Sequence, residues 1–117
     1  IPEYARRNAE KGLKMRSEYS KEERPVLGVG EANRKGVHSG VTTARTLIRG
    51  VEQGQRLSLG MARRIKSFLS RMHGQLDRAE RKGWDEDKIV TSIMVWGGQR
   101  DERFLEYLET HLEDGKE

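Results

Sequence analysis

The clearest pattern in this chain is a repeat of apolar side chains at helical spacing in residues 57–72. The apolar residues fall on one side of a helix with 3.6 residues per turn: Met61, Ile65, Phe68, Leu69 and Met72. Ser58 is placed to accept a hydrogen bond from the free amides of the first turn, and Gly74 is expected to end the helix. These residues predict an amphipathic helix that packs on a core through one face.

Helical patterns also occur in segments 2–19, 39–50, 85–96 and 101–112. Ser39 and Asp85 are expected to be N-caps of the second and third of these segments. Gly50 is expected to stop the second, and Gly97 and Gly98 the third. The sequence therefore predicts five helices, each with an apolar face.

Two segments leave other structures open. The run 89–95 is rich in β-branched residues and is compatible with a strand, but no second alternating segment exists for it to pair with, so a helix is favoured. Residues 20–40 contain Pro25 and four glycines, which predicts a long loop with at most a single helical turn at 31–34. We therefore expect an all-α fold, a small bundle of about five helices with a long glycine-containing loop.

The chain has the length of a single domain, residues 1–117. Within it, we expect 39–117 to form a compact helical core, and 1–38 to supply a basic helix and loop, either as part of the bundle or as an extended arm. Hydrophobic residues make up 33% and charged residues 36%, so the core is expected to be thin. Because the first residue is Ile and not Met, we expect the chain to have been trimmed, processed or excerpted from something longer.

Charge is divided unevenly along the chain. Residues 1–74 hold 16 Lys/Arg and 7 Asp/Glu, a net charge of +9, whereas residues 75–117 hold 7 and 12, a net charge of −5. A dipolar charge distribution attracts a polyanion to one end of a molecule and repels it from the other. Nucleic acid, DNA in preference to RNA, is therefore the first partner to consider.

Several classes of protein are disfavoured by what the sequence lacks. It has no cysteine, and no apolar run approaches the roughly 18 residues that span a bilayer, so we expect no disulfide, no thiolate chemistry and no membrane contact. The segment GVGEANRKG lacks the third glycine of a dinucleotide-binding loop, and His38, His73 and His111 lack the spacing of a zinc site. We therefore expect a non-enzymatic protein with no catalytic residues, cofactor or metal.

The helices at 39–50 and 57–72 have the general layout of a helix-turn-helix, in which the second helix enters the major groove. On this interpretation, Arg63, Lys66 and Arg71 face DNA, and Ser67 approaches a base edge or a phosphate. The cations expected to hold the phosphate backbone are Arg45, Arg49 and Arg56. The connection 50–57 is longer than the usual turn, so two helices of a simple bundle with solvated basic faces are an equal alternative.

The N-terminal helix offers a second basic surface. Its candidate phosphate contacts are Arg6, Arg7, Lys11 and Lys14. The same cations are equally suited to binding the acidic half of a neighbouring copy or another acidic protein, which would favour self-association or a structural role.

Three sequence patterns, SGV..AR.L..G, LS....RRI.SF..RM and a Trp-Gly-Gly, together resemble small helical, virion-associated domains of tailed bacteriophages. The matching residues are Ser39, Gly40, Val41, Ala44, Arg45, Leu47, Gly50, Leu57, Ser58, Arg64, Ile65, Ser67, Phe68, Arg71, Met72, Trp96, Gly97 and Gly98. This chain departs from the family in its longer VEQGQR connection and in Gln99 and Arg100 after the glycines. The resemblance implies a phage protein located in the virion or the host cytoplasm, and it carries over no catalytic residue.

Two functions therefore remain open. The first is electrostatic binding of nucleic acid, and the second is a virion structural role on a capsid, portal or decoration protein through protein–protein contacts. In either case the shared residues predict a scaffold in which Trp96 is buried against the two central helices.

Overall fold

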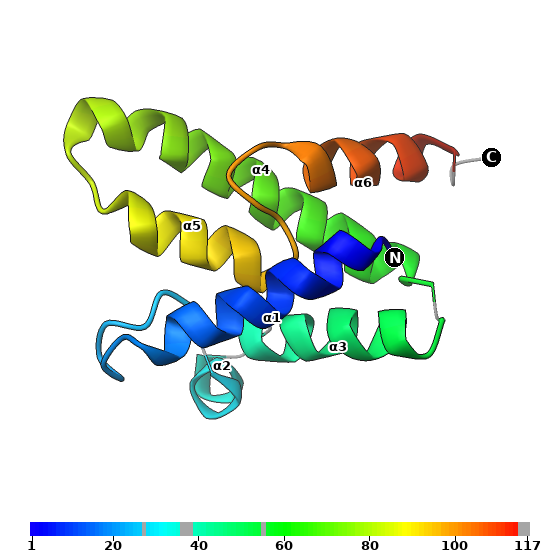
Figure 1. The fold of residues 1–117 in the computed structure, drawn as a ribbon, viewed down its shortest axis with the longest axis horizontal. Helices are drawn as coiled ribbons and strands as arrows, with labels where there is room; N and C mark the ends of the chain where they lie inside the picture. Colours follow the sequence, from blue (N-terminus) through cyan, green and yellow to red (C-terminus); the bar gives the residue numbers. More distant parts are fainter. Residues whose placement is uncertain (27, 36–38, 55, 115–117) are drawn as a thin grey trace.

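The computed structural model describes residues 1–26, 28–35, 39–54 and 56–114 of the chain. These residues form six helices and no strand: α1 (Glu3–Ser17), α2 (Val29–Lys35), α3 (Gly40–Glu52), α4 (Leu59–Lys82), α5 (Glu86–Val95) and α6 (Arg103–Asp114). Figure 1 shows them as a small bundle. The expected all-α class is confirmed, including the helix at α5 in place of a strand.

The longest helix, α4, forms one side of the bundle. Its 24 residues extend for about 36 Å at 1.5 Å per residue, close to the 41 Å longest dimension of the molecule. Helices α5 and α6 both pack on α4, and α5 folds back along it after a tight turn (Figure 1). Helix α1 packs on α3 and α5 on the other side. Helix α4 therefore keeps a long outer face that no other helix covers extensively.

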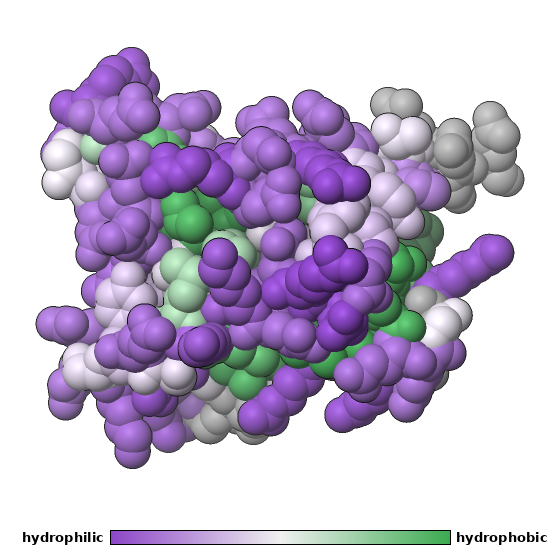
Figure 2. Space-filling model, viewed as in Figure 1, coloured by the Kyte–Doolittle hydropathy of each residue, from purple (hydrophilic) through white to green (hydrophobic). Residues whose placement is uncertain are grey.

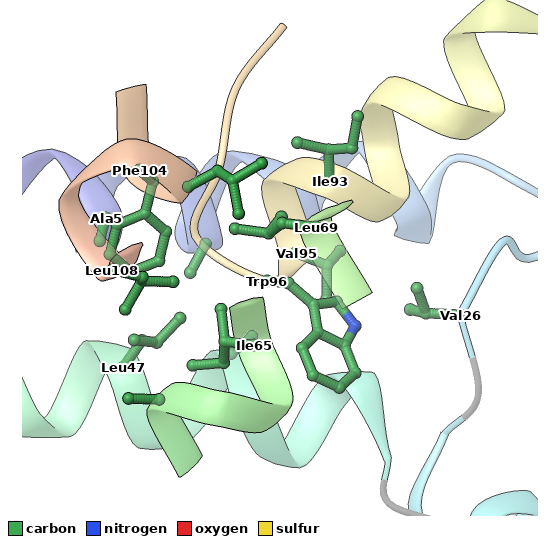
Figure 3. Close-up of a cluster of buried hydrophobic side chains, with 14 of the residues drawn as sticks. Ala5, Val26, Leu47, Ile65, Leu69, Ile93, Val95, Trp96, Phe104 and Leu108 are labelled. Atoms are coloured by element: carbon green, nitrogen blue, oxygen red, sulfur yellow. The ribbon is translucent and has the colours of Figure 1, made fainter. Parts of the chain in front are cut away.

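A single hydrophobic core joins α1, α3, α4, α5 and α6 (Figure 3). Its fully buried large side chains are Leu47, Ile65, Leu69, Ile93, Val95, Phe104 and Leu108. Trp96 is 6% exposed, and its indole stacks on Phe68 with ring centres 4.1 Å apart. The burial of Trp96 that the sequence predicts is confirmed.

Helix α1 approaches α5 very closely at Gly12. A Cβ atom at this position would lie 2.6 Å from the carbonyl carbon of Met94, so any side chain here would displace backbone. Ala9 and Ala5, one and two turns before Gly12, are fully buried. The α1 segment is therefore part of the core, and the alternative of an extended N-terminal arm is wrong.

Local capping signals are confirmed where the sequence placed them. The side chains of Ser39, Ser58 and Asp85 accept hydrogen bonds from the backbone amides at the starts of α3, α4 and α5. Gly97 has φ +89°, a left-handed conformation that glycine adopts without steric cost, and it follows the end of α5. These features depend on residues three or four positions apart, which a sequence displays directly.

The expected stops at Gly50 and Gly74 are wrong. Gly50 lies inside α3, where it is buried and packs closely on Ile1, and α3 continues to Glu52. Gly74 lies inside α4, which continues for two more turns to Lys82 and ends at Gly83 with φ +68°. A glycine lowers helix stability by only about 1 kcal/mol relative to alanine, so buried side chains on both sides of it maintain the helix.

The expected loop at 20–40 contains a helix, α2. Its Ala32 is buried, α2 packs on α3, and Lys35 forms an ion pair with Glu31 at 3.5 Å. The segment before α2 is also anchored, because Val26 is buried and its carbonyl accepts a hydrogen bond from Arg16 Nε at 3.1 Å. Residues 36–38 of the expected loop, which include His38, lie outside the described residues.

The helix-turn-helix expected from α3 and α4 is not formed. Its two helices pack mainly on other partners, α3 on α1 and α5, and α4 on α5 and α6. The long connection after α3 allows α4 to start away from it, so the two helices lack the close mutual packing that presents a recognition helix. The bundle alternative describes this part of the chain.

The surface is predominantly hydrophilic. Figure 2 shows one face, on which purple hydrophilic residues surround smaller green hydrophobic areas. No helix in the described part of the chain is long and apolar enough to cross a bilayer.

Candidate nucleic-acid interface

The outer face of α4 carries an open groove with polar and basic walls. Its lining residues are Arg63, Lys66, Ser67, Ser70 and Arg71 of α4, with Leu112 of α6, and its volume is about 600 Å³. Four of these residues were expected from the sequence to face nucleic acid: Arg63, Lys66, Ser67 and Arg71. The structure brings all four together in one place.

The helical repeat explains why these side chains point outward. The buried positions of α4 are Ala62, Ile65, Leu69, His73, Leu76 and Ala79, which recur every three or four residues on the core side. The groove residues follow the same spacing on the opposite side. Arg71 also lies over the ring of Phe68, with its guanidinium carbon 5.9 Å from the ring centre, which supports the side chain at the rim of the groove.

The groove cations have no acidic partner among the described residues. Arg63 and Arg71 are exposed, Lys66 is half-buried, and none of the three forms an ion pair there. Helix α4 holds 7 Lys/Arg and 2 Asp/Glu, a net charge of +5, whereas the whole chain has +4. The rest of the chain has a net charge of −1, because residues 83–117 hold 4 Lys/Arg and 10 Asp/Glu while residues 1–58 hold 12 and 7. Helix α4 therefore carries as much net positive charge in 24 residues as the 58 residues before it.

Three further cations on α4 were missed by sequence reasoning, because Gly74 was expected to end the helix. Arg78, Arg81 and Lys82 are exposed and extend the basic face to the end of α4. Arg78 lies back along the helix and donates from Nε to the Gly74 carbonyl at 3.2 Å. The sequence did contain a signal for the longer helix, because the apolar repeat continues through Leu76 and Ala79.

The remaining predicted cations of the central region lie elsewhere. Arg45 and Arg49 are exposed on α3, which does not pack extensively on α4. Arg56 is exposed and lines a second groove, between the start of α4 and α6. The structure therefore does not assemble these arginines with the α4 groove into one site.

The cations of α1 are in part paired within the helix. Arg6 forms ion pairs with Glu3 and Glu10, the second at 2.7 Å, and Arg7 lies 3.8 Å from Glu3. The hydrogen bond from Arg6 lowers the pKa of Glu3, and the two carboxylates raise the pKa of Arg6. Lys11 and Lys14 are exposed and form no ion pair with the described residues. Helix α1 therefore offers fewer free cations than its sequence suggests.

The second groove is mostly apolar. Its volume is about 610 Å³, and its lining residues are Ile1, Arg56, Leu57, Leu59, Ala62, Tyr107, Leu108, His111 and Leu112. Leu59 is 45% exposed at its edge. Hydrophobic residues gather at the right-hand edge of Figure 2, where Figure 1 places the N-terminus and the start of α4. Leu112 lines both grooves, so the basic and apolar surfaces are neighbours.

Comparisons with protein-family models, with curated proteins and with solved structures found no match for this chain. Among the described residues, no group of three or more His, Asp or Glu side chains is arranged to hold a metal ion. The groove itself presents cations and two hydroxyl groups.

Proposed function

We propose that this protein is a small, non-enzymatic phage protein that binds nucleic acid electrostatically along the outer face of α4. One observation carries the proposal: Arg63, Lys66 and Arg71 line a single open groove without an ion pair to any described residue. Cations that are already paired must lose an acidic partner before they contact a phosphate, whereas these cations have no such partner among the described residues.

The dimensions of α4 suit a phosphate backbone. From Arg63 to Lys82 the helix rises about 28 Å, which is the length of roughly eight base pairs along the axis of a duplex at 3.4 Å each. Ser67 and Ser70 supply hydroxyl donors between the cations in the groove. This arrangement favours binding that depends on charge and shape and reads little base sequence.

Fluorescence anisotropy of a labelled DNA duplex, titrated with salt, tests the proposal. Each phosphate contact contributes about −0.9 to the slope of log K against log salt. The variant Arg63→Ala plus Arg71→Ala should therefore bind more weakly and lower the magnitude of this slope by about 1.8. The matched control is Arg45→Ala plus Arg49→Ala, which removes the same charge from the exposed side of α3 and should change binding less.

The absence of binding at low salt would contradict the proposal. Equal losses in the α4 and α3 variants would also contradict it, because they would show that net charge matters and the groove does not.

A second candidate is a virion structural role through protein–protein contacts. It is favoured by the apolar groove, with Leu59 exposed at its edge, since a specific protein interface needs an apolar centre. Binding to a capsid or portal protein through this groove should tolerate salt and weaken on Leu59→Ala. Nucleic-acid binding along α4 should instead weaken steeply with salt and be insensitive to that change.

The phage assignment rests on the resemblance of roughly residues 9–98 to virion-associated domains, which is most specific between Ser39 and Met72. In the structure, residues of that pattern lie at caps and in the core, such as Ser39, Ser58 and Trp96. Their positions are consistent with a shared scaffold, and two further residues of the pattern, Ser67 and Arg71, line the α4 groove. Mass spectrometry of purified virions from a phage that encodes this chain would test this part of the proposal.

A further inference from the structure

Trp84 is a large aromatic side chain that the fold leaves exposed. It is 43% exposed, whereas the other tryptophan, Trp96, is 6% exposed. Trp84 follows Gly83, which turns the chain at the end of α4, and its backbone amide donates to the Ala79 carbonyl at 3.2 Å. These backbone contacts hold Trp84 in a fixed position against the end of the helix, although its indole remains accessible.

A row of cations on α4 leads from the groove to this indole. Arg71, Arg78 and Lys82 are spaced by seven and four residues, so they lie on one side of the helix and span about 16 Å. Lys82 Nζ lies 5.4 Å from the centre of the Trp84 ring. The last cation of the basic face is therefore adjacent to an exposed aromatic surface.

We propose that the indole of Trp84 stacks on an unpaired base of a single-stranded nucleic acid whose phosphates follow the cations of α4. The inference rests on the proposed function, and it specifies a single strand as the form of nucleic acid that the protein prefers. Aromatic side chains beside a basic track bind single strands because every base has a face on which to stack, while the bases of a duplex are already stacked on each other. Lys82 is placed to meet the phosphate of the same nucleotide.

An exposed tryptophan beside cations is also found where proteins meet an anionic membrane surface. A single strand is favoured here because Trp84 lies at the end of a long row of cations. An interfacial helix instead carries a broad apolar face along its length. The outer face of α4 has arginine, lysine and serine at the groove positions.

The two tryptophans make the test direct, because only Trp84 is accessible to a base. Unlabelled oligothymidylate of roughly 12 nucleotides, longer than the strand that α4 can contact, should quench the fluorescence of Trp84. Trp84→Ala and Trp84→Leu should abolish this quenching and weaken single-strand binding about 5-fold to 150-fold, with Trp84→Phe between them and the wild type. Duplex affinity and the salt slope should not change.

Leu59→Ala is the matched control and should leave single-strand affinity unchanged, since Leu59 is the other large hydrophobic side chain that is exposed within the described part of the chain. Circular dichroism melting of each variant shows that the fold is retained.

Three results would overturn the inference. If wild type and Trp84→Ala bind oligothymidylate equally, and both depend on Arg63 and Arg71, the stacking role fails while the proposed function stands. Equal weakening of duplex and single strand by Trp84→Ala would also overturn it. A blue shift of Trp84 fluorescence with phosphatidylglycerol vesicles, without quenching by the oligonucleotide, would assign Trp84 to a membrane surface.

Discussion

Helices α1 and α4 are the two most basic helices of the molecule, and they use their cations differently. Helix α1 holds 5 Lys/Arg and 2 Asp/Glu, and both acids pair with Arg6. Arg16 of α1 donates to the Val26 carbonyl, and burial lowers its pKa. In α4, the groove cations Arg63, Lys66 and Arg71 form no ion pair with the described residues. The difference shows that a count of charges overstates what α1 offers to a partner.

The packing of the two helices explains this difference. Helix α1 packs against both α3 and α5, so much of its surface is in contact with other helices. Helix α4 packs on α5 and α6 through its apolar positions and leaves its outer side open. A binding surface is therefore expected on a basic helix that packs on the bundle through one face and leaves the opposite face exposed.

The largest effect is expected from the core on which both helices depend. Trp96→Ala removes an indole that is 6% exposed and stacked on Phe68 of α4, which should cost about 3 to 5 kcal/mol of unfolding free energy. Urea denaturation followed by circular dichroism measures this loss. Trp84→Ala is the control and should change stability by less than about 0.5 kcal/mol, because Trp84 is on the surface. Equal losses in the two variants would contradict the assigned core.

The second-largest effect is on stability, and it should have opposite signs for Gly→Ala substitutions in α1 and in α4. Gly12→Ala places a methyl group against the α5 backbone and should destabilise the protein by about 2 kcal/mol or more through overpacking. Gly60→Ala, in the first turn of α4, meets no atom within 4 Å and should stabilise it by up to about 1 kcal/mol. Thermal melting of both variants provides the comparison. A Gly12→Ala protein as stable as the wild type would mean that α1 does not dock closely on α5.

A third experiment compares the cations directly. Arg78→Ala plus Arg81→Ala removes two exposed cations from the extension of α4 and should reduce the magnitude of the salt slope for duplex DNA by about 1.8. Arg6→Ala plus Arg7→Ala removes the same charge from α1 and should leave the slope nearly unchanged, because these arginines face Glu3 and Glu10. The reverse result would transfer the binding surface to α1.

The smallest effect is the pH dependence of the α1 ion pairs. The pKa of Glu3 is lowered by the hydrogen bond from Arg6, so its contribution to stability is present above the ordinary glutamate pKa and is lost as the pH falls. Carbon-detected NMR titration of the Glu3 carboxyl group measures its pKa in the wild type and in Arg6→Ala, where the pKa should rise. No change in Arg6→Ala would show that the pair does not form in solution.

Features of the fold that depend on neighbouring residues were predictable from the sequence. The caps Ser39, Ser58 and Asp85 and the apolar repeat of α4 are all local patterns. The roles of Gly50 and Gly74 were not predictable, because whether a glycine ends a helix depends on what packs beside it. Gly50 accommodates Ile1, which is distant in the sequence.

The candidate site was also predictable from the sequence only where it depends on local spacing. The spacing of Arg63, Lys66, Ser67 and Arg71 placed them on one face, and the structure adds that this face forms a groove with Leu112 of α6. Arg78, Arg81 and Lys82 were missed because the helix was expected to end at Gly74. The pairing of Arg6 with Glu3 and Glu10 was readable from their separations of three and four residues, and it limits the contribution of α1.

The central claim is that the outer side of α4 contacts the nucleic acid and α1 does not. The most direct measurement is a ¹H–¹⁵N NMR titration of the labelled protein with an unlabelled oligonucleotide at low salt. The amide signals of residues 63–84 should shift, and those of residues 6–14 should remain in place. Shifts confined to 6–14, or spread evenly over all exposed helices, would contradict the claim.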